Sequence, residues 1–216
     1  MNHHESTNPY SANHIYWSGA SGAQYPQVRP DNRKMAKLDR ILSSWSGAPK
    51  KGALFAIKKY GLPDELTRSM LIWHYRRPWK CIVIHRDPVP HNFPMPHPDF
   101  FEQTINYRVP PELFDEVGKY DGSVRVDRTK GEASAKCDKE PMNILALNLL
   151  NDIVVGKRSV EEARMFYAEQ AIQFNVHHKP SPYTSRLLFP IPTDTADPDK
   201  PVVTMEPRIE SSKDET

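Results

Sequence analysis

The stretch 73–102, WHYRRPWKCIVIHRDPVPHNFPMPHPDFFE, decides how the rest of the chain is arranged. Two segments typical of β-strands, Ser69–Tyr75 and Trp79–His85, are separated by a short connection that ends at Pro78. Aromatic and β-branched residues on both sides of a short turn predict a β-hairpin. The second strand leads into a proline-rich segment, in which we expect a stiff loop because proline fixes a backbone dihedral.

This Pro/His-rich loop concentrates side chains that bind metals or transfer protons. Neutral imidazoles and carboxylates are ligands of divalent metals. The expected metal ligands are His91, His97, Asp99 and Glu102. A histidine paired with a carboxylate can also move protons near neutral pH. The expected acid/base residues are His85, Asp87, His91 and His97.

A purely structural role for the same residues is the alternative. The histidines would then cap strands and turns or bind backbone groups near the prolines, and Asp99 and Glu102 would open a helical turn. The spacing between His91 and His97 fits neither one face of a helix nor one face of a strand. The sequence therefore leaves open whether these side chains converge.

Segments on both sides of the loop predict helices. Apolar residues at helical spacing predict an amphipathic helix over 37–45. A second helix should run from about Pro49 to Gly61, with Leu54, Ile57 and Tyr60 buried. After the loop we expect a strand at 103–109 and a short helix at 112–119.

The C-terminal half of the domain predicts a β-hairpin followed by an αα-hairpin. With Lys130-Gly131 as a two-residue turn, Val124 should pair with Cys137, Val126 with Ala135, and Arg128 with Ala133. A helix should then start at Pro141 and end at Gly156. Ser159 and Glu162 have the spacing of a capping box, which predicts the start of the next helix.

These elements predict an α+β domain with an antiparallel sheet of two or more hairpins, covered mainly on one face by helices. We place this single domain at residues 35–190. Residues 1–34 are expected to form a disordered arm, and residues 191–216 a disordered acidic, proline-rich tail.

The passage from helix to strands through Tyr60-Gly61-Leu62-Pro63-Asp64-Glu65 resembles the repeating unit of the small outer-membrane assembly lipoproteins. The resemblance covers a short part of the chain. It implies a local shape, a helix followed by two strands, and no function.

Composition narrows the classes of partner. The net charge of +2 is too small to create a field that attracts nucleic acid, so we expect no nucleic-acid partner. The N-terminal residues lack the pattern of a secretory signal, and the apolar runs are too short to span a bilayer. We expect Cys81 and Cys137 to be buried free thiols, and the protein to be cytoplasmic.

Two functional hypotheses follow from these features. The first is a soluble binding or accessory protein that presents the Pro/His-rich loop to a protein partner or a small-molecule ligand. The alternative is a small enzyme, a hydrolase or oxidoreductase, that uses residues 85–102 either with a divalent metal or as His/carboxylate acid/base pairs. The absence of a complete catalytic or cofactor motif in the sequence favours the first. A divalent metal is the one cofactor that the residue types indicate.

Overall fold

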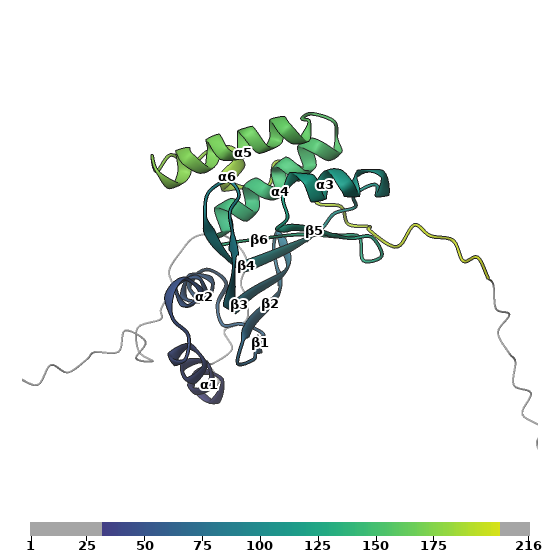
Figure 1. The fold of residues 1–216 in the computed structure, drawn as a ribbon. Helices are drawn as coiled ribbons and strands as arrows, with labels where there is room; N and C mark the ends of the chain where they lie inside the picture. The colour runs from purple at the N-terminus through teal and green to yellow at the C-terminus, as the bar shows by residue number, and fades with distance from the viewer. Residues whose placement is uncertain (1–31, 204–216) are drawn as a thin grey trace, which may run out of the picture.

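A six-stranded antiparallel sheet carries the fold, with the strands in the order β1-β2-β3-β4-β6-β5 (Figure 1). The computed structural model describes residues 32–203. The strands are β1 (Glu65–Leu66), β2 (Met70–Arg76), β3 (Trp79–His91), β4 (His97–Asn106), β5 (Val124–Asp127) and β6 (Glu132–Cys137). The α-helices are α1 (Asn32–Ser43), α2 (Gly47–Tyr60), α3 (Phe114–Tyr120), α4 (Glu140–Val154), α5 (Val160–Asn175) and α6 (Pro182–Ser185), and a 3-10 turn, η1 (Pro111–Leu113), precedes α3.

The hairpin of β2 and β3 confirms the strand pair that the sequence predicts. Trp73 pairs with Ile82, and Leu71 pairs with Ile84. All four side chains are fully buried because they point to the face of the sheet that the helices cover. Alternate residues of a strand point to opposite faces, so His85 lies on the opposite, open face.

The segment that we expected to be a proline-rich loop is mostly strand. β3 continues to His91 and β4 begins at His97, six residues earlier than the strand expected from 103, so that only residues 92–96 form a turn. β2 pairs with β3 only as far as His85, and β6 pairs with β4 only as far as Phe101. Pro88, Pro90 and Pro98 therefore lie on a two-stranded ribbon whose outer edges have no strand partner among residues 32–203, where a missing N–H removes no ladder hydrogen bond. Pro94 and Pro96 lie in the turn.

The hairpin of β5 and β6 exists, but its register differs from the expected one by two residues. Val124 pairs with Ala135 rather than Cys137, and Val126 pairs with Ala133 rather than Ala135. Arg128 belongs to the turn, which Asp127 stabilises by accepting a hydrogen bond of 2.9 Å from the backbone N–H of Lys130. An even shift leaves every side chain on its expected face.

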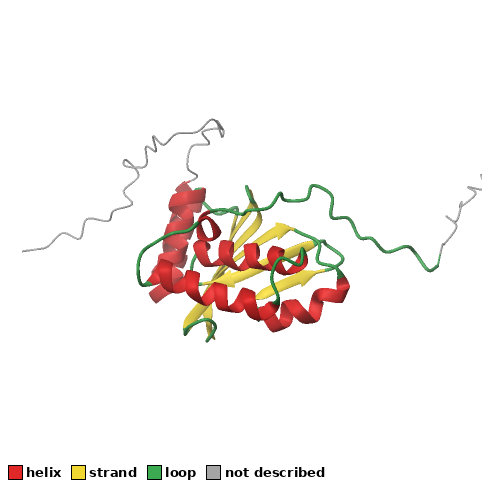
Figure 2. Ribbon diagram, turned by 90° about the horizontal axis from the view of Figure 1, so that it is seen from above, coloured by secondary structure: helices red, strands yellow, loops and turns green. Residues whose placement is uncertain are grey.

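Helices cover one face of the sheet, as predicted (Figure 2). Small residues let α2 lie close to the strands, since a Cβ atom on Gly52 would lie 2.4 Å from the ring of Phe100. The buried side chains of α2 are therefore those of Pro49, Ala53 and Ala56. The larger residues that we expected in the core, Leu54, Ile57 and Tyr60, are half-buried instead.

α4 and α5 form the expected αα-hairpin. Gly156 has a φ of +70° just beyond α4, a conformation that favours glycine. At the start of α5 the Ser159 N–H donates to Glu162 (2.8 Å), and the Glu162 N–H donates to the Ser159 hydroxyl (3.2 Å). This confirms the capping box.

The described chain is structured beyond both boundaries that we expected for the domain, residues 35 and 190. α1 begins at Asn32, so residues 32–34 of the expected arm are helical. Residues 191–203, which we assigned to the tail, contain no helix or strand, yet Thr195 is buried and Asp199 pairs with Arg128. The remaining parts of the expected arm and tail, residues 1–31 and 204–216, lie outside the described residues.

Candidate metal centre

The far end of the β3–β4 ribbon brings three of the expected metal ligands together. His91 and His97 face each other in the last pair of the ladder. Residues directly opposite on an antiparallel pair lie on the same face. Asp99 follows His97 by two residues and so shares that face as well. The ladder therefore supplies the convergence that the spacing along the chain could not guarantee.

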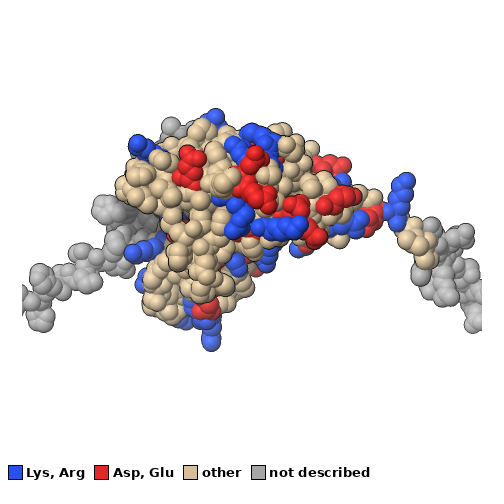
Figure 3. All heavy atoms as spheres, turned by 45° about the horizontal axis from the view of Figure 1, so that its top comes forward, with Lys and Arg blue, Asp and Glu red and all other residues tan. Residues whose placement is uncertain are grey.

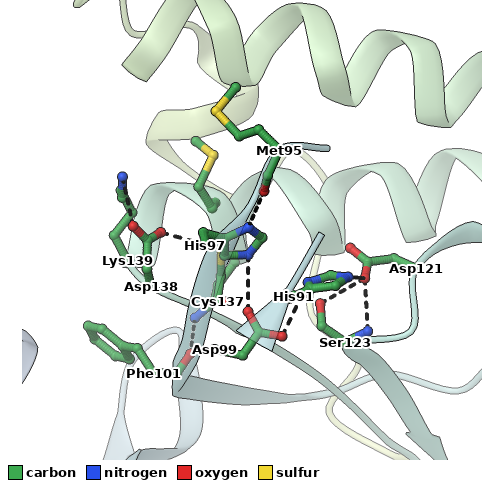
Figure 4. A network of polar contacts seen from close by, with 12 residues as sticks. His91, Met95, His97, Asp99, Phe101, Asp121, Ser123, Cys137, Asp138 and Lys139 are labelled. Atoms are coloured by element: carbon green, nitrogen blue, oxygen red, sulfur yellow. Dashed lines mark hydrogen bonds and ion pairs between the residues drawn. The ribbon is translucent and has the colours of Figure 1, made fainter. Parts of the chain in front are cut away.

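Asp99 lies between the two imidazole rings (Figure 4). Its Oδ2 is 3.2 Å from His91 Nδ1, and its Oδ1 is 3.1 Å from His97 Nε2. The ring centroids of the two histidines are 4.9 Å apart. One ligand atom from each of the three residues lies within 4.8 Å of the other two, which is close enough for all three to hold one ion.

The outer nitrogen of each histidine also faces an acceptor. His97 Nδ1 is 2.8 Å from the carbonyl oxygen of Met95, so the ring donates its Nδ1–H and keeps the Nε2 lone pair directed at the cluster. His91 Nε2 is 3.7 Å from Asp121, whose Oδ1 accepts hydrogen bonds of 2.8 Å from the N–H and hydroxyl of Ser123. Such outer acceptors are typical of metal-binding histidines, because they fix the tautomer and the orientation of the ring.

The inner atoms of the cluster are buried and lack hydrogen bonds. Solvent reaches 19% of the His91 side chain, 12% of His97 and 6% of Asp99. Within residues 32–203, the buried atoms His91 Nδ1, His97 Nε2 and Asp99 Oδ1 have ion-pair distances but not hydrogen-bond geometry. Imidazole lone pairs that face a buried carboxylate are unfavourable unless a cation or a proton lies between them.

The electrostatics of the cluster favour added positive charge. Burial lowers the pKa of His97, but the contacts with Asp99 and the Met95 carbonyl outweigh it, so the pKa lies above its ordinary value. Burial raises the pKa of Asp121, and the hydrogen bonds from Ser123 oppose this rise. The negative charge of the Asp99 carboxylate can thus be balanced either by a proton on His97 or by a bound metal ion.

A surface depression borders the cluster on one side, and aromatic packing covers the other. A surface depression of about 310 Å³, lined mainly by prolines of the ribbon, reaches both His91 and His97. On the inner side Phe93 packs against Tyr167 of α5, with ring centroids 5.2 Å apart, and the guanidinium of Arg164 lies 3.9 Å from the Phe93 ring. The depression is thus the solvent-exposed surface next to the cluster, while the three inner ligand atoms themselves are buried.

The other expected site residues lie elsewhere. Glu102 points to the open face of the sheet, where it contacts His85 at 3.2 Å and also Arg125. Burial raises the pKa of Glu102, but these two partners outweigh it and lower the pKa. Asp87 is exposed and pairs with Arg86 at 2.7 Å. The structure therefore brings together His91, His97 and Asp99, and does not bring His85, Asp87 or Glu102 to them.

Sequence reasoning did not identify Asp121 as part of the site. Asp121 lies just beyond the short helix expected at 112–119, and its side chain caps the following turn by accepting from Ser123. It reaches His91 because α3 ends beside the ribbon, which is a tertiary contact without a local signal.

No family model, curated protein or solved structure matches the chain. None of the helices in residues 32–203 is long and apolar enough to cross a membrane. On the face drawn in Figure 3, acidic and basic side chains are interspersed.

Proposed function

We propose that this protein binds a divalent metal ion through His91, His97 and Asp99 and presents it to a ligand at the proline-lined depression. The observation that carries the proposal is the set of three buried ligand atoms that face one another without hydrogen bonds. Two imidazoles and one carboxylate suit zinc and its neighbours in the first transition row better than Ca²⁺ or Mg²⁺, which prefer oxygen ligands. The free thiols Cys81 and Cys137 suit a reducing compartment, and we propose a cytoplasmic location.

A metal-dependent enzyme is the second candidate, and the number of converging protein ligands, three, favours it. Catalytic zinc sites use three protein ligands and leave a further position for water or substrate, whereas structural sites are closed by four. A water bound at that position would be activated for hydrolysis. Two histidines and one carboxylate are also the ligand set of non-haem iron oxygenases, which corresponds to the oxidoreductase alternative.

Metal titration of the purified protein tests the proposal. After dialysis against chelator, Co²⁺ should bind at one equivalent and give the visible absorption of a nitrogen- and oxygen-ligated ion, and Zn²⁺ should displace it. His91→Ala, His97→Ala and Asp99→Asn should each abolish this binding. His85→Ala is the matched control, since His85 is also half-buried beside a carboxylate but lies on the other face. Equal binding by the His85→Ala and His97→Ala variants would refute the site.

A second measurement separates a ligand-presenting site from an enzyme. Azide or imidazole added to the Co²⁺ form should change its absorption if the bound ion keeps a coordination position for an added ligand. Multiple turnover of p-nitrophenyl acetate or p-nitrophenyl phosphate by the Zn²⁺ form, lost in His97→Ala, would favour the enzyme. A change in absorption without turnover of either substrate would favour the binding protein.

A further inference from the structure

A second cavity, of about 340 Å³, lies away from the histidine cluster. It is formed by the end of α2, the turn between β2 and β3, the start of α4 and the chain after α6. Trp79 contributes to its wall and Phe189 to its apolar lining, and we call it the Trp79 cavity. None of its lining residues belongs to the candidate metal centre.

The one acidic residue that lines the Trp79 cavity, Glu140, is fully engaged by neighbouring groups. Lys59 and Tyr60 both donate to its carboxylate, and Gln103 Nε2 donates at 2.7 Å. Burial and the neighbouring Glu140 raise the pKa of Tyr60 far above its ordinary range, so the phenol adds no negative charge. The charge of Glu140 is therefore compensated by Lys59 inside the protein.

Two further cations at the cavity are without partners. The side chains of Arg77 and Arg186 are exposed, and within residues 32–203 neither guanidinium makes a hydrogen bond or ion pair. The turn of the first hairpin supplies Arg77, and the segment after α6 supplies Arg186. A concave site with an apolar lining and a few polar groups is the usual form of a small-molecule site, and guanidinium groups bind carboxylate and phosphate groups with two hydrogen bonds.

We propose that the Trp79 cavity binds a small organic anion, with its carboxylate or phosphate group on Arg77 and Arg186 and its apolar body against Phe189 and the neighbouring aliphatic side chains. The volume fits a single aromatic ring with a short charged substituent, at the lower end of ordinary ligand sites. The charges of the two arginines exceed what the lining carboxylate balances, since Lys59 already pairs with Glu140. A carboxylate would offset one of these two positive charges, and a doubly charged phosphate group would offset both.

The indole N–H of Trp79 reports on this cavity, because it donates to the Tyr60 hydroxyl at 3.0 Å in the cavity wall. Phenylacetate and phenyl phosphate are the anionic probes, phenylacetamide is the neutral one and inorganic phosphate lacks the apolar body. The anionic aryl probes should shift the Trp79 indole resonance in a saturable way, at least tenfold more tightly than phenylacetamide and inorganic phosphate. The stronger of the two anionic probes identifies the charged group.

Arginine variants decide whether the charges are responsible. Arg77→Gln and Arg186→Gln should each weaken binding about tenfold or more, and Arg108→Gln, an exposed arginine outside the cavity, should leave it unchanged. His97→Ala should also leave it unchanged, so that loss of the metal site and loss of this site are distinguishable. The proposal is overturned if phenylacetamide binds as tightly as phenylacetate, if no probe binds with a Kd below about 10 mM, or if Arg77→Gln and Arg186→Gln bind as well as the unaltered protein.

Discussion

At the scale of single residues, the candidate centre depends on groups that hold the histidine rings as well as on the ligands themselves. His91 has one nitrogen directed at Asp99 and the other at Asp121, which Ser123 holds in place. Outer carboxylates of this kind raise the basicity of a metal-binding imidazole and fix its orientation. Asp121 should therefore influence metal affinity without contacting the ion.

Asp121→Asn tests this positioning role. The amide keeps an oxygen that can accept from Ser123, so the turn should persist, but the negative charge beside His91 is lost. We expect Co²⁺ affinity to fall by about 10- to 100-fold, as is usual for outer-shell partners. Isothermal titration calorimetry measures this effect, and Asp87→Asn is the control because Asp87 is exposed, lies within the ladder irregularity and pairs with Arg86. Unchanged affinity in Asp121→Asn would show that Asp121 serves only the turn.

Residue types in the sequence were sufficient to identify His91, His97 and Asp99 as candidates, but not to separate them from Glu102. That separation comes from strand parity: Asp99 and Glu102 are three residues apart on β4 and so point to opposite faces. Because we expected a loop at this position, we did not apply the alternation of strand side chains to these residues. Proline lacks the backbone N–H that pairs with a neighbouring strand, which argued against a strand here. The composition could not show that the outer edges of this ribbon have no neighbouring strand and so need no such N–H.

At the scale of elements, β3 joins the core to the candidate site. Its first half is buried by the helices, with Ile82 and Ile84 fully inaccessible, and its second half carries His91 on the ribbon. The ladder irregularity between Ile84 and Val89 separates the two halves. Stability and ligand binding should therefore depend on different parts of one strand.

Ile84→Ala should destabilise the protein by about 2–5 kcal/mol, because it removes buried methyl groups and leaves a cavity. His91→Ala and His97→Ala should each cost the metal-free protein less than Ile84→Ala, about 1–2 kcal/mol, because the inner nitrogens make no hydrogen bond and the main loss is the imidazole beside buried Asp99. Urea unfolding of the three variants, monitored by tryptophan fluorescence, gives these values. If the histidine variants are as unstable as Ile84→Ala, the cluster is structural and the candidate site is lost.

At the scale of the whole molecule, the sequence predicted the local hairpins better than their assembly. The β2–β3 pair, the β5–β6 pair and the αα-hairpin each have signals within a short stretch of chain. The pairing of β4 with β6 joins residues far apart in sequence, such as Phe101 and Cys137, and no local pattern marks it. The same holds for the C-terminal segment, where polar composition predicted a tail and Thr195 is nonetheless buried.

This C-terminal contact yields a prediction about Gly131, in the turn between β5 and β6. Gly131 has a φ of +60°, and a Cβ atom there would lie 2.2 Å from the backbone oxygen of Thr195. Gly131→Ala should therefore have two costs in the full chain: about 1–2 kcal/mol for the left-handed backbone and a further cost for displacing residues 193–199. In a chain that ends at residue 192 only the first cost remains.

A double-mutant cycle separates the two costs. We expect Gly131→Ala to lower the free energy of unfolding more in the full chain than in the shortened one, as measured by urea unfolding of all four proteins. Gly118→Ala is the control, since no atom lies within 4 Å of its Cβ position and its effect should be the same in both chains. Equal effects of Gly131→Ala in the two chains would mean that the segment around Thr195 contributes no stability at this turn.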